Sequence, residues 1–286
     1  MNVVRTVADV RDALGPARRA QRSIGLVPTM GALHEGHLSL VRAAREHNDV
    51  VVVSLFVNPA QFEDAGDLAA YPRDEQRDAV LAADAGADLL FVPTREEVYP
   101  PGFATTVSVG GVLTATLEGA QRGTTHFDAV TTVVTKLLNM VSPDVAYFGQ
   151  KDAQQALVVR RLVADLNLPV RICVRPTIRE PDGLARSSRN ARLNADERER
   201  ALALRSALDA AQRAVTAGER DADAVGLTAR AAMISFGVEP EYVALVAADS
   251  LAPVARIEPD TLVAVAARVG ATRLIDNTIL HPNGRP

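Results

Sequence analysis

The chain has 286 residues, a length that predicts about two domains. Apolar residues make up 48% of it and charged residues 23%, which is the ordinary balance of a globular protein. Its 31 Lys and Arg against 35 Asp and Glu give a net charge of −4, and Trp is absent, so the composition argues against a polybasic or aromatic-rich nucleic-acid-binding protein.

Strand-like and helix-like segments alternate along the first two-thirds of the chain. Apolar runs predict strands at 23–27, 50–57, 87–92, 144–148 and 170–174, and helical composition predicts helices at 36–46, 74–85, 127–140 and 153–166. The run 50–57 is almost continuously apolar, as in a strand covered on both faces. This alternation predicts an α/β fold with a Rossmann-like, doubly wound parallel sheet, whose ligands lie beyond the carboxyl ends of the strands.

The pattern changes near residue 176, where Pro176, Pro181 and Gly183 mark a turn-rich joint. Asn194 and Glu197 then form a capping-box pattern before a helix with one apolar face. A further helix is predicted at 221–236 and strands at 242–246, 262–269 and 274–280, followed by a loose tail at 281–286. We therefore expect a first domain at 1–176 and a smaller α+β domain at 177–286.

Cysteine content and hydropathy bear on the location of the protein. Cys173 is the only cysteine, which excludes a disulfide within the chain and a cysteine-rich zinc site. No apolar stretch reaches the roughly 20 residues that cross a bilayer, and residues 1–20, with four Arg and two Asp, lack the apolar core of a secretory signal. The sequence therefore predicts a cytoplasmic protein with no membrane partner.

The first polar cluster, at 28–37, lies where a predicted strand gives way to a glycine-containing loop and a helix. His34 and His37 are three residues apart and share one face of that helix. Exposed N–H groups of its first turn and the helix dipole would favour an anion, so the cluster predicts a phosphate site with two imidazole donors. The alternatives are surface or capping histidines, or zinc, but the pair is one residue short of the zinc-protease spacing.

The second cluster, at 148–155, again follows a strand and begins a helix. Gly149 leaves backbone N–H groups accessible, Lys151 suits a phosphate, and Asp152 can cap the helix or accept a sugar hydroxyl. Gln155 lies one turn further on. The alternative is a plain helix cap beside a solvated lysine.

Two further clusters complete the set. At 186–190, two serines are flanked by arginines at the joint between the domains, which suits phosphate oxygens, or a solvated linker. At the end of the run 50–57, Asn58 and Gln61 offer neutral hydrogen bonds beside apolar walls, which suits a small organic acid, or a simple turn.

These strings together resemble the pantothenate synthetase (pantoate–β-alanine ligase) family. They are residues 28–37, Asn58-Pro59 with Gln61-Phe62, Tyr71-Pro72-Arg73, 148–152 with Gln154-Gln155, and Ser187-Ser188-Arg189-Asn190. Their order matches the family from about residue 24 to 193, and the smaller C-terminal unit fits in size and position. The resemblance implies a fold related to class I aminoacyl-tRNA synthetases and nucleotidylyltransferases, with a His-x-Gly-His signature.

The resemblance also implies a two-step reaction. The pantoate carboxylate attacks the α-phosphorus of ATP, giving pantoyl adenylate and pyrophosphate, and the amine of β-alanine then attacks the acyl carbon, releasing AMP and pantothenate. ATP is a substrate, Mg²⁺ binds mainly to its phosphate oxygens and to water, and a homodimer is expected. Small-molecule substrates, with no nucleic acid, are the expected partners.

By resemblance, each singled-out residue receives a role. His34, His37, Lys151 and Arg189 are the expected catalytic groups. ATP would be bound by these four together with Met30, Gly149, Asp152, Ser187 and Ser188, and pantoate by Gln61, Gln155, Pro28, Met30 and Phe148. Asn58, Tyr71 and Arg122 are expected in the β-alanine pocket, and Asp78 near the magnesium ion.

Two positions depart from the family pattern. Arg186 stands where the family often has Met, and Ala153 where an aromatic residue often follows Lys-Asp. Three other functions compete with the ligase. A nucleotidylyltransferase of the same fold would need a basic acceptor pocket, a nucleotide-sensing module would give Lys151 and the Ser-Ser-Arg loop no task, and a zinc hydrolase would hold zinc.

Overall fold

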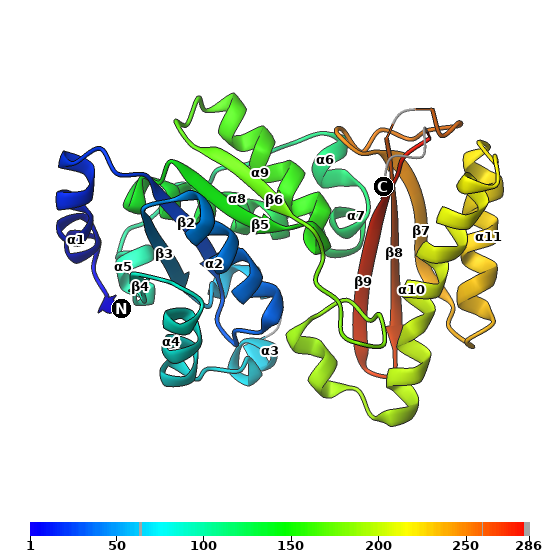
Figure 1. The fold of residues 1–286 in the computed structure, drawn as a ribbon, viewed down its shortest axis with the longest axis horizontal. Helices are drawn as coiled ribbons and strands as arrows, with labels where there is room; N and C mark the ends of the chain where they lie inside the picture. Colours follow the sequence, from blue (N-terminus) through cyan, green and yellow to red (C-terminus); the bar gives the residue numbers. More distant parts are fainter. Residues whose placement is uncertain (63–64, 259, 283–286) are drawn as a thin grey trace. The chain divides into compact units, whose positions relative to one another are not determined.

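The computed structural model describes residues 1–62, 65–258 and 260–282. The chain divides into two compact units (Figure 1). Unit 1 comprises Met1–Gly149 with Gln155–Pro176, and unit 2 comprises Gln150–Gln154 with the chain from Thr177 onward. The segment Gln150–Gln154, which the sequence assigned to the first domain, therefore packs with the second unit.

Unit 1 is built on a six-stranded sheet in the order β1-β4-β3-β2-β5-β6, and its strand pairs are parallel. The strands are β1 (Asn2–Val4), β2 (Ile24–Thr29), β3 (Val50–Leu55), β4 (Leu89–Phe91), β5 (Val145–Gly149) and β6 (Arg171–Arg175). The chain winds outward from β2 in one direction and from β5 in the other. The carboxyl ends of β2 and β5 therefore form the switch point at which such sheets bind ligands.

Helices cover both faces of this sheet (Figure 1). Leu26 and Val52 pack on one face against α1 (Val7–Arg19), α8 (Thr124–Val141) and α9 (Ala153–Asp165). Val51 and Val53 pack on the other against α2 (Glu35–His47) and α4 (Glu75–Asp84). Neighbouring β3 residues therefore pack in two different cores, which confirms that this strand is covered on both faces, as the apolar run predicted.

Some elements differ from the sequence prediction. The strand predicted at 50–57 ends at Leu55, and the one predicted at 23–27 continues to Thr29, because Pro28 and Thr29 stay in register with Ser54 and Leu55. Strand β1, helix α1 and several short helices were not predicted. The short ones are α3 (Ala65–Ala70), α5 (Arg95–Val98), α6 (Val112–Ala115), α7 (Glu118–Arg122) and the 3-10 turns η1 (Pro59–Gln61) and η2 (Gln150–Asp152).

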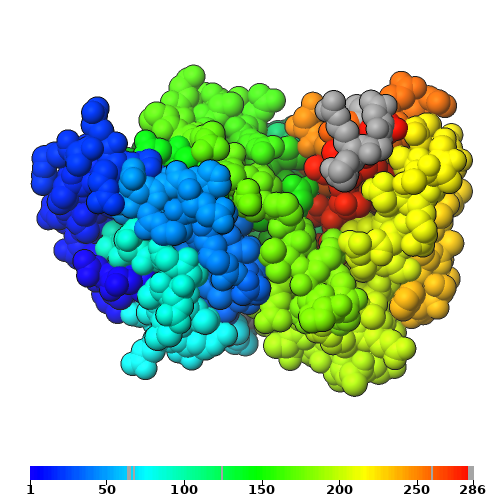
Figure 2. Space-filling model, viewed as in Figure 1, coloured from blue at the N-terminus to red at the C-terminus, as the bar shows by residue number. Residues whose placement is uncertain are grey.

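Unit 2 has the smaller α+β architecture that the sequence predicted. Its antiparallel sheet has the order β7-β8-β9, with β7 at Pro240–Ala247, β8 at Thr261–Val269 and β9 at Thr272–Leu280. Helices α10 (Ala195–Thr216) and α11 (Ala222–Ile234) pack on it around a buried core that includes Leu204, Met233 and Val263. Figure 2 accordingly shows these helices as a broad yellow surface with only a small red patch of the C-terminal strands beside it.

Capping residues fix the start of the principal helix of unit 2, α10. Asn194 accepts from the Glu197 amide, and the Glu197 carboxylate accepts from the Asn194 amide, which confirms the predicted capping box. The 3-10 turn η3 (Ser188–Arg192) lies just before this helix.

The predicted tail at 281–286 lies mostly outside the described residues. Within the described ranges, the structure contains no helix long and apolar enough to cross a membrane.

Candidate active site

The first component of the site is the pair of histidines at the start of α2. His34 is the N-cap residue, with extended backbone and no side-chain capping bond, and its carbonyl accepts from the His37 amide at 2.8 Å. The two imidazole rings are stacked, with centroids 4.1 Å apart and planes 20° from parallel. A Cβ on Gly36 would lie 3.0 Å from the His34 ring, so a larger residue there would require the ring to shift by a few tenths of an ångström. Imidazoles and a helix N-terminus here point to an anion site.

The loop before the histidines is held by Asp78 of α4. The Asp78 carboxylate is 1% exposed, and its two oxygens accept from the amides of Ala32 and Leu33, each at 2.8 Å. Gly31 and Ala32 both have positive φ, 87° and 51°, so this is a tight, left-handed turn. The sequence suggested Asp78 as a partner of magnesium. Both oxygens bind main-chain N–H groups, so Asp78 holds the loop in place, and its position near magnesium stays a prediction.

A second component is a hydrogen-bonded amide cluster at the end of β3. Asn58 is 1% exposed, and its Nδ2 donates to Gln61 Oε1 at 3.1 Å and to the Ala129 carbonyl at 3.2 Å. The Tyr99 hydroxyl donates to Asn58 Oδ1 at 3.0 Å. Burial raises the pKa of Tyr99 to about 12, although the Asn58 hydrogen bond lowers it somewhat, so this donor stays protonated at ordinary pH. The Gln61 Nε2 donor is thereby turned away from Asn58.

Arg122 and Tyr71 contact the surroundings of Gln61. Arg122 donates to the Gln61 carbonyl at 3.5 Å and lies 3.1 Å from the His126 Nε2. The Tyr71 ring meets the Phe62 ring edge-on at 5.6 Å between centroids. The residues predicted for β-alanine therefore lie in the same part of unit 1 as Gln61.

The predicted apolar wall and the β5 end also belong to unit 1. Pro28 lies at the carboxyl end of β2, and Met30 follows in the loop, both partly buried. Phe148 is 6% exposed and belongs to the core beside the sheet. A Cβ on Gly149 would meet no protein atom within 4 Å, so the space beside it is open. Gln155 is partly buried near the start of α9.

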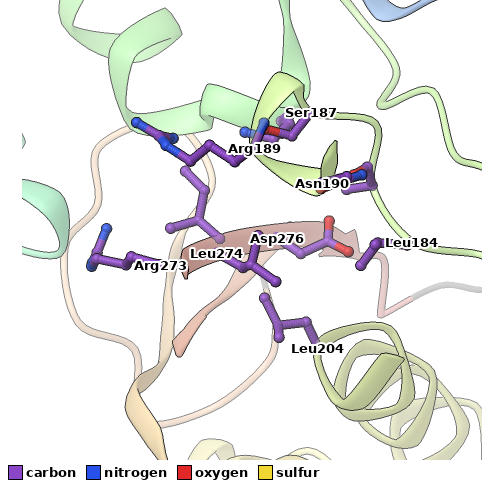
Figure 3. Close-up of a pocket in the computed structure, with 11 residues that line it drawn as sticks. Leu184, Ser187, Arg189, Asn190, Leu204, Arg273, Leu274 and Asp276 are labelled. Carbon is purple, nitrogen blue, oxygen red and sulfur yellow. The ribbon is translucent and has the colours of Figure 1, made fainter. Parts of the chain in front are cut away.

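The third component is a pocket in unit 2 (Figure 3). Lys151, Ser187, Arg189 and Arg273 line it, together with the buried Asp276. Ser187 Oγ accepts from the Arg189 amide at 3.3 Å, which caps η3. Three cationic side chains in one pocket suit phosphate oxygens. Arg273 was not singled out by the sequence, since no local motif marks it.

Partners limit the charge that this pocket presents. Lys151 Nζ lies 3.5 Å from the half-exposed carboxylate of Asp152. Arg273 donates to Glu241 at 2.6 Å, and Asp276 accepts two hydrogen bonds from Arg179, at 2.6 and 3.1 Å. Arg189 is exposed. Lys151 and Arg189 are therefore the cations best placed to meet an anionic ligand in unit 2.

A partly buried carboxylate supports the Ser187–Arg189 segment. Glu180 accepts from Asn190 Nδ2 at 2.7 Å, pairs with Arg186 at 3.1 Å and also binds Arg198. Burial alone would raise the pKa of Glu180, but the hydrogen bonds from Asn190 and Arg198 and the nearby guanidinium charges hold it below its ordinary value. Arg186, just before the two serines, and Asn190, two residues after them, are thus tied to one anionic group.

Comparison with known proteins gives the site its context. Residues 2–279 match the family described as Pantoate-beta-alanine ligase. The chain belongs to this ligase family. The pantothenate synthetase of Moorella thermoacetica is 53% identical over 99% of this chain and 100% of its own length, and that of Roseiflexus castenholzii is 51% identical over 98% and 100%.

Solved structures of the ligase family have the same fold. The pantothenate synthetase from Thermus thermophilus aligns with a TM-score of 0.93 at 46% identity, covering 99% of this chain and 100% of that one. The ligase from Francisella tularensis, described as complexed with Beta-gamma ATP and Beta-alanine, aligns with a TM-score of 0.80 at 32% identity, over 98% and 97%. Both coverages extend over unit 1 and unit 2, and they agree with the predicted fold class.

The structure shows the surroundings of the two departures from the ligase pattern. Arg186 pairs with Glu180, so its charge is used within unit 2. Ala153 is 7% exposed at the start of α9, where an aromatic ring would have to be accommodated in a buried position. Neither residue removes a charged group from the components described above.

Proposed function

We propose that this ligase condenses pantoate with β-alanine through a pantoyl-adenylate intermediate. Family membership supports the overall reaction, and a relative described as complexed with ATP and β-alanine supports the choice of substrates. The observation that carries the adenylation step is the stacked His34–His37 pair at the N-terminus of α2, a seat for negative charge. In the steps below, each side chain either neutralises charge on a phosphate or positions a reactant.

In the first step, an oxygen of the pantoate carboxylate attacks the α-phosphorus of ATP, and the bond to the bridging oxygen of pyrophosphate breaks. In unit 1, His34 and His37 would donate to the phosphate oxygens as charge builds on them. In unit 2, Lys151 would stabilise the α-phosphate, and Ser187, Ser188 and Arg189 would bind the β- and γ-phosphates. In the second step, the β-alanine amine attacks the acyl carbon and AMP leaves with the bonding electrons.

The remaining assignments concern the substrates' other groups. We assign the ribose to Asp152 and the Gly149 backbone, and a further ATP contact to Met30. Pantoate would bind Gln61 through its Nε2 donor, since Oε1 already accepts from Asn58, and would also bind Gln155. Its gem-dimethyl group would contact the apolar residues Pro28, Met30 and Phe148. The β-alanine carboxylate would meet Arg122, with Asn58 and Tyr71 beside it.

Magnesium is assigned to the ATP substrate and not to a protein site. Mg²⁺ retains water and binds phosphate oxygens readily. Among the residues that the structure describes, no group of three or more His, Cys, Asp or Glu side chains is arranged to hold a metal ion.

We also propose a homodimer and a cytoplasmic location. Sedimentation analysis tests the dimer, and fractionation of cells tests the location.

One experiment separates the ligase from its rivals. The protein is incubated with ATP, Mg²⁺ and pantoate, with and without β-alanine, and the products are identified. Pantoate-dependent pyrophosphate release, with pantothenate formed only when β-alanine is added, is the expected result. Pyrophosphate release that needs a phosphate acceptor would indicate a nucleotidylyltransferase, and no turnover would indicate a binding module.

Two substitutions test the catalytic assignments within that experiment. Lys151→Ala and His37→Ala should each slow adenylate formation by about 100-fold or more, since a preorganised charge-stabilising donor contributes on that scale. The pantoate Kd should change little, because neither group is assigned to pantoate. Equal losses in rate and in pantoate affinity would argue against a transition-state role.

A further inference from the structure

A buried asparagine in unit 2 holds the backbone of the segment that carries Lys151. Asn277 lies on β9, opposite Ala264 of β8, and is 5% exposed. Its Nδ2 donates to the carbonyl of Gln150 at 3.0 Å and to the carbonyl of Lys151 at 2.9 Å. Its Oδ1 accepts from Gln150 Nε2 at 3.1 Å. The Asn277 side chain therefore binds the carbonyls of two consecutive residues and also the side chain of Gln150, in the turn between β5 and α9.

The orientation of the Asn277 amide is itself fixed. Both Nδ2 hydrogens have acceptors, and the oxygen has a donor, so rotation by 180° would place donors against donors and acceptors against acceptors. The main-chain N–H of Asn277 donates to Asp276 Oδ1 at 2.8 Å, and the Asp276 carboxylate in turn accepts two hydrogen bonds from Arg179. This set of contacts leaves Asn277 a single arrangement that satisfies every partner.

The contact explains why the segment Gln150–Gln154 groups with unit 2, although β5 before it and the rest of α9, from Gln155 onward, belong to unit 1. A lysine ammonium lies at the end of a flexible four-carbon side chain, so its position depends on where the lysine backbone is held. Lys151 is only 17% exposed and lines the pocket together with Ser187 and Arg189. Holding its carbonyl fixes the origin of the stem relative to the other pocket residues.

We propose that Asn277 is a positioning residue for Lys151, acting through the backbone of Gln150 and Lys151. The inference rests on the proposed function, in which Lys151 stabilises the α-phosphate. A displacement of about 1 Å at a catalytic group can cost about 100-fold in rate. Asn277→Ala should therefore lower kcat for pantoate-dependent pyrophosphate release by about 10- to 100-fold, and should leave the KM for pantoate within about 3-fold.

Two companion variants and a matched control sharpen the test. Gln150→Ala removes only the donor to Asn277 Oδ1 and carries little folding risk, and it should lower kcat by about 3- to 10-fold, in line with one lost hydrogen bond. Asn48→Ala removes an asparagine that is also buried, 6% exposed, and bonded to Ala44 and Tyr147 in unit 1. It should lower stability without a comparable loss of kcat.

A double variant shows whether Asn277 acts through Lys151. In the Lys151→Ala background, Asn277→Ala should reduce kcat by no more than about 2- to 3-fold, because residues that act through one group are not additive. A further 10-fold loss in that background would overturn the proposal, since a general structural defect reduces both proteins alike. An unchanged kcat in both Asn277→Ala and Gln150→Ala, in folded protein, would overturn it as well.

Hydrogen exchange provides a readout that does not depend on turnover. Asn277→Ala should speed exchange in the peptide covering residues 150–154 and leave the peptides of α11 unchanged, and the Lys151 amine should react faster with an acylating reagent. Unchanged exchange and amine reactivity would overturn the proposal. If the wild-type protein releases no pyrophosphate with pantoate, the proposed function fails, while exchange and Lys151 reactivity still decide whether Asn277 positions this lysine.

Discussion

Asp78→Ala is the substitution that most directly tests how the histidine loop is held. Asp78 is 1% exposed, and its carboxylate accepts from the Ala32 and Leu33 amides at 2.8 Å each. Hydrogen bonds to a charged group contribute about 1.5–3 kcal/mol each, so about 3–6 kcal/mol depends on this carboxylate. The ion pair with Arg77, at 3.6 Å and with the arginine half-exposed, adds little.

Relief of backbone strain offsets part of this loss. Ala32 has a φ of 51°, and an L residue in the left-handed region costs about 1–2 kcal/mol. Once the Asp78 carboxylate is gone, the turn can relax out of that conformation. The net loss in the free energy of unfolding of unit 1 should therefore be about 1–5 kcal/mol. Because His34 follows the turn directly, pantoate-dependent pyrophosphate release should fall at the same time.

Urea titration read by hydrogen exchange of the α4 peptides measures unit 1 separately from unit 2. Asp74→Ala is the matched control, since Asp74 is the exposed N-cap of the same helix and its loss should cost about 1 kcal/mol. Asp78→Asn should fall between the wild type and Asp78→Ala, because its amide keeps one acceptor but turns an N–H toward a second N–H. A loss for Asp78→Ala no greater than that of Asp74→Ala would refute this account of the loop.

Three further outcomes are expected. Glu180→Gln should weaken the fall in the free energy of unfolding at acid pH. The folded pKa of Glu180 lies below its ordinary 4.5, so the stability it contributes is present above pH 4.5 and is lost as pH falls through the folded value. Acid titration of both proteins measures the difference. Gln61→Ala should chiefly raise the KM for pantoate in steady-state kinetics, and an unchanged KM would remove Gln61 from that pocket. Tyr99→Phe should cost about 1 kcal/mol in urea titration, equally from pH 6 to 9 because the pKa of about 12 keeps the hydroxyl protonated, and a cost that varied with pH over that range would contradict this.

The parts of the fold that the sequence predicts are those that local pattern determines. The apolar run 50–57 indicated a strand with two covered faces, and neighbouring β3 residues do pack in separate cores. The Asn194–Glu197 pattern located the start of α10. Helix α1 was missed, since Gly15 and Pro16 lie within its apolar pattern, although Thr6 and Asp9 form a capping box there. That pair was the available signal.

The candidate site divides in the same way. His34 and His37 are close in sequence, so their spacing predicts that they lie near each other, although His34 is the extended N-cap of α2 and not a helical residue. The groups that hold the site are distant in sequence and carry no motif: Asp78 lies 46 residues from Ala32, and Asn277 lies 126 residues from Lys151. Their partners are main-chain atoms, which every residue possesses, so no residue type at the other end of the contact marks it.

This difference bears on how the chemistry is built. A phosphate-binding side chain such as Lys151 or His37 must be of one chemical type, and a sequence shows that type directly. The position of the side chain depends on buried hydrogen bonds to its backbone, made here by Asp78 for the loop before the histidines and by Asn277 for the lysine. Since a displacement of about 1 Å can cost as much rate as a lost donor, the two kinds of residue should have comparable effects on kcat. Substitutions at Asp78 and Asn277 should therefore rank with those at His37 and Lys151 in turnover, and be told apart from them by exchange of the backbone they hold.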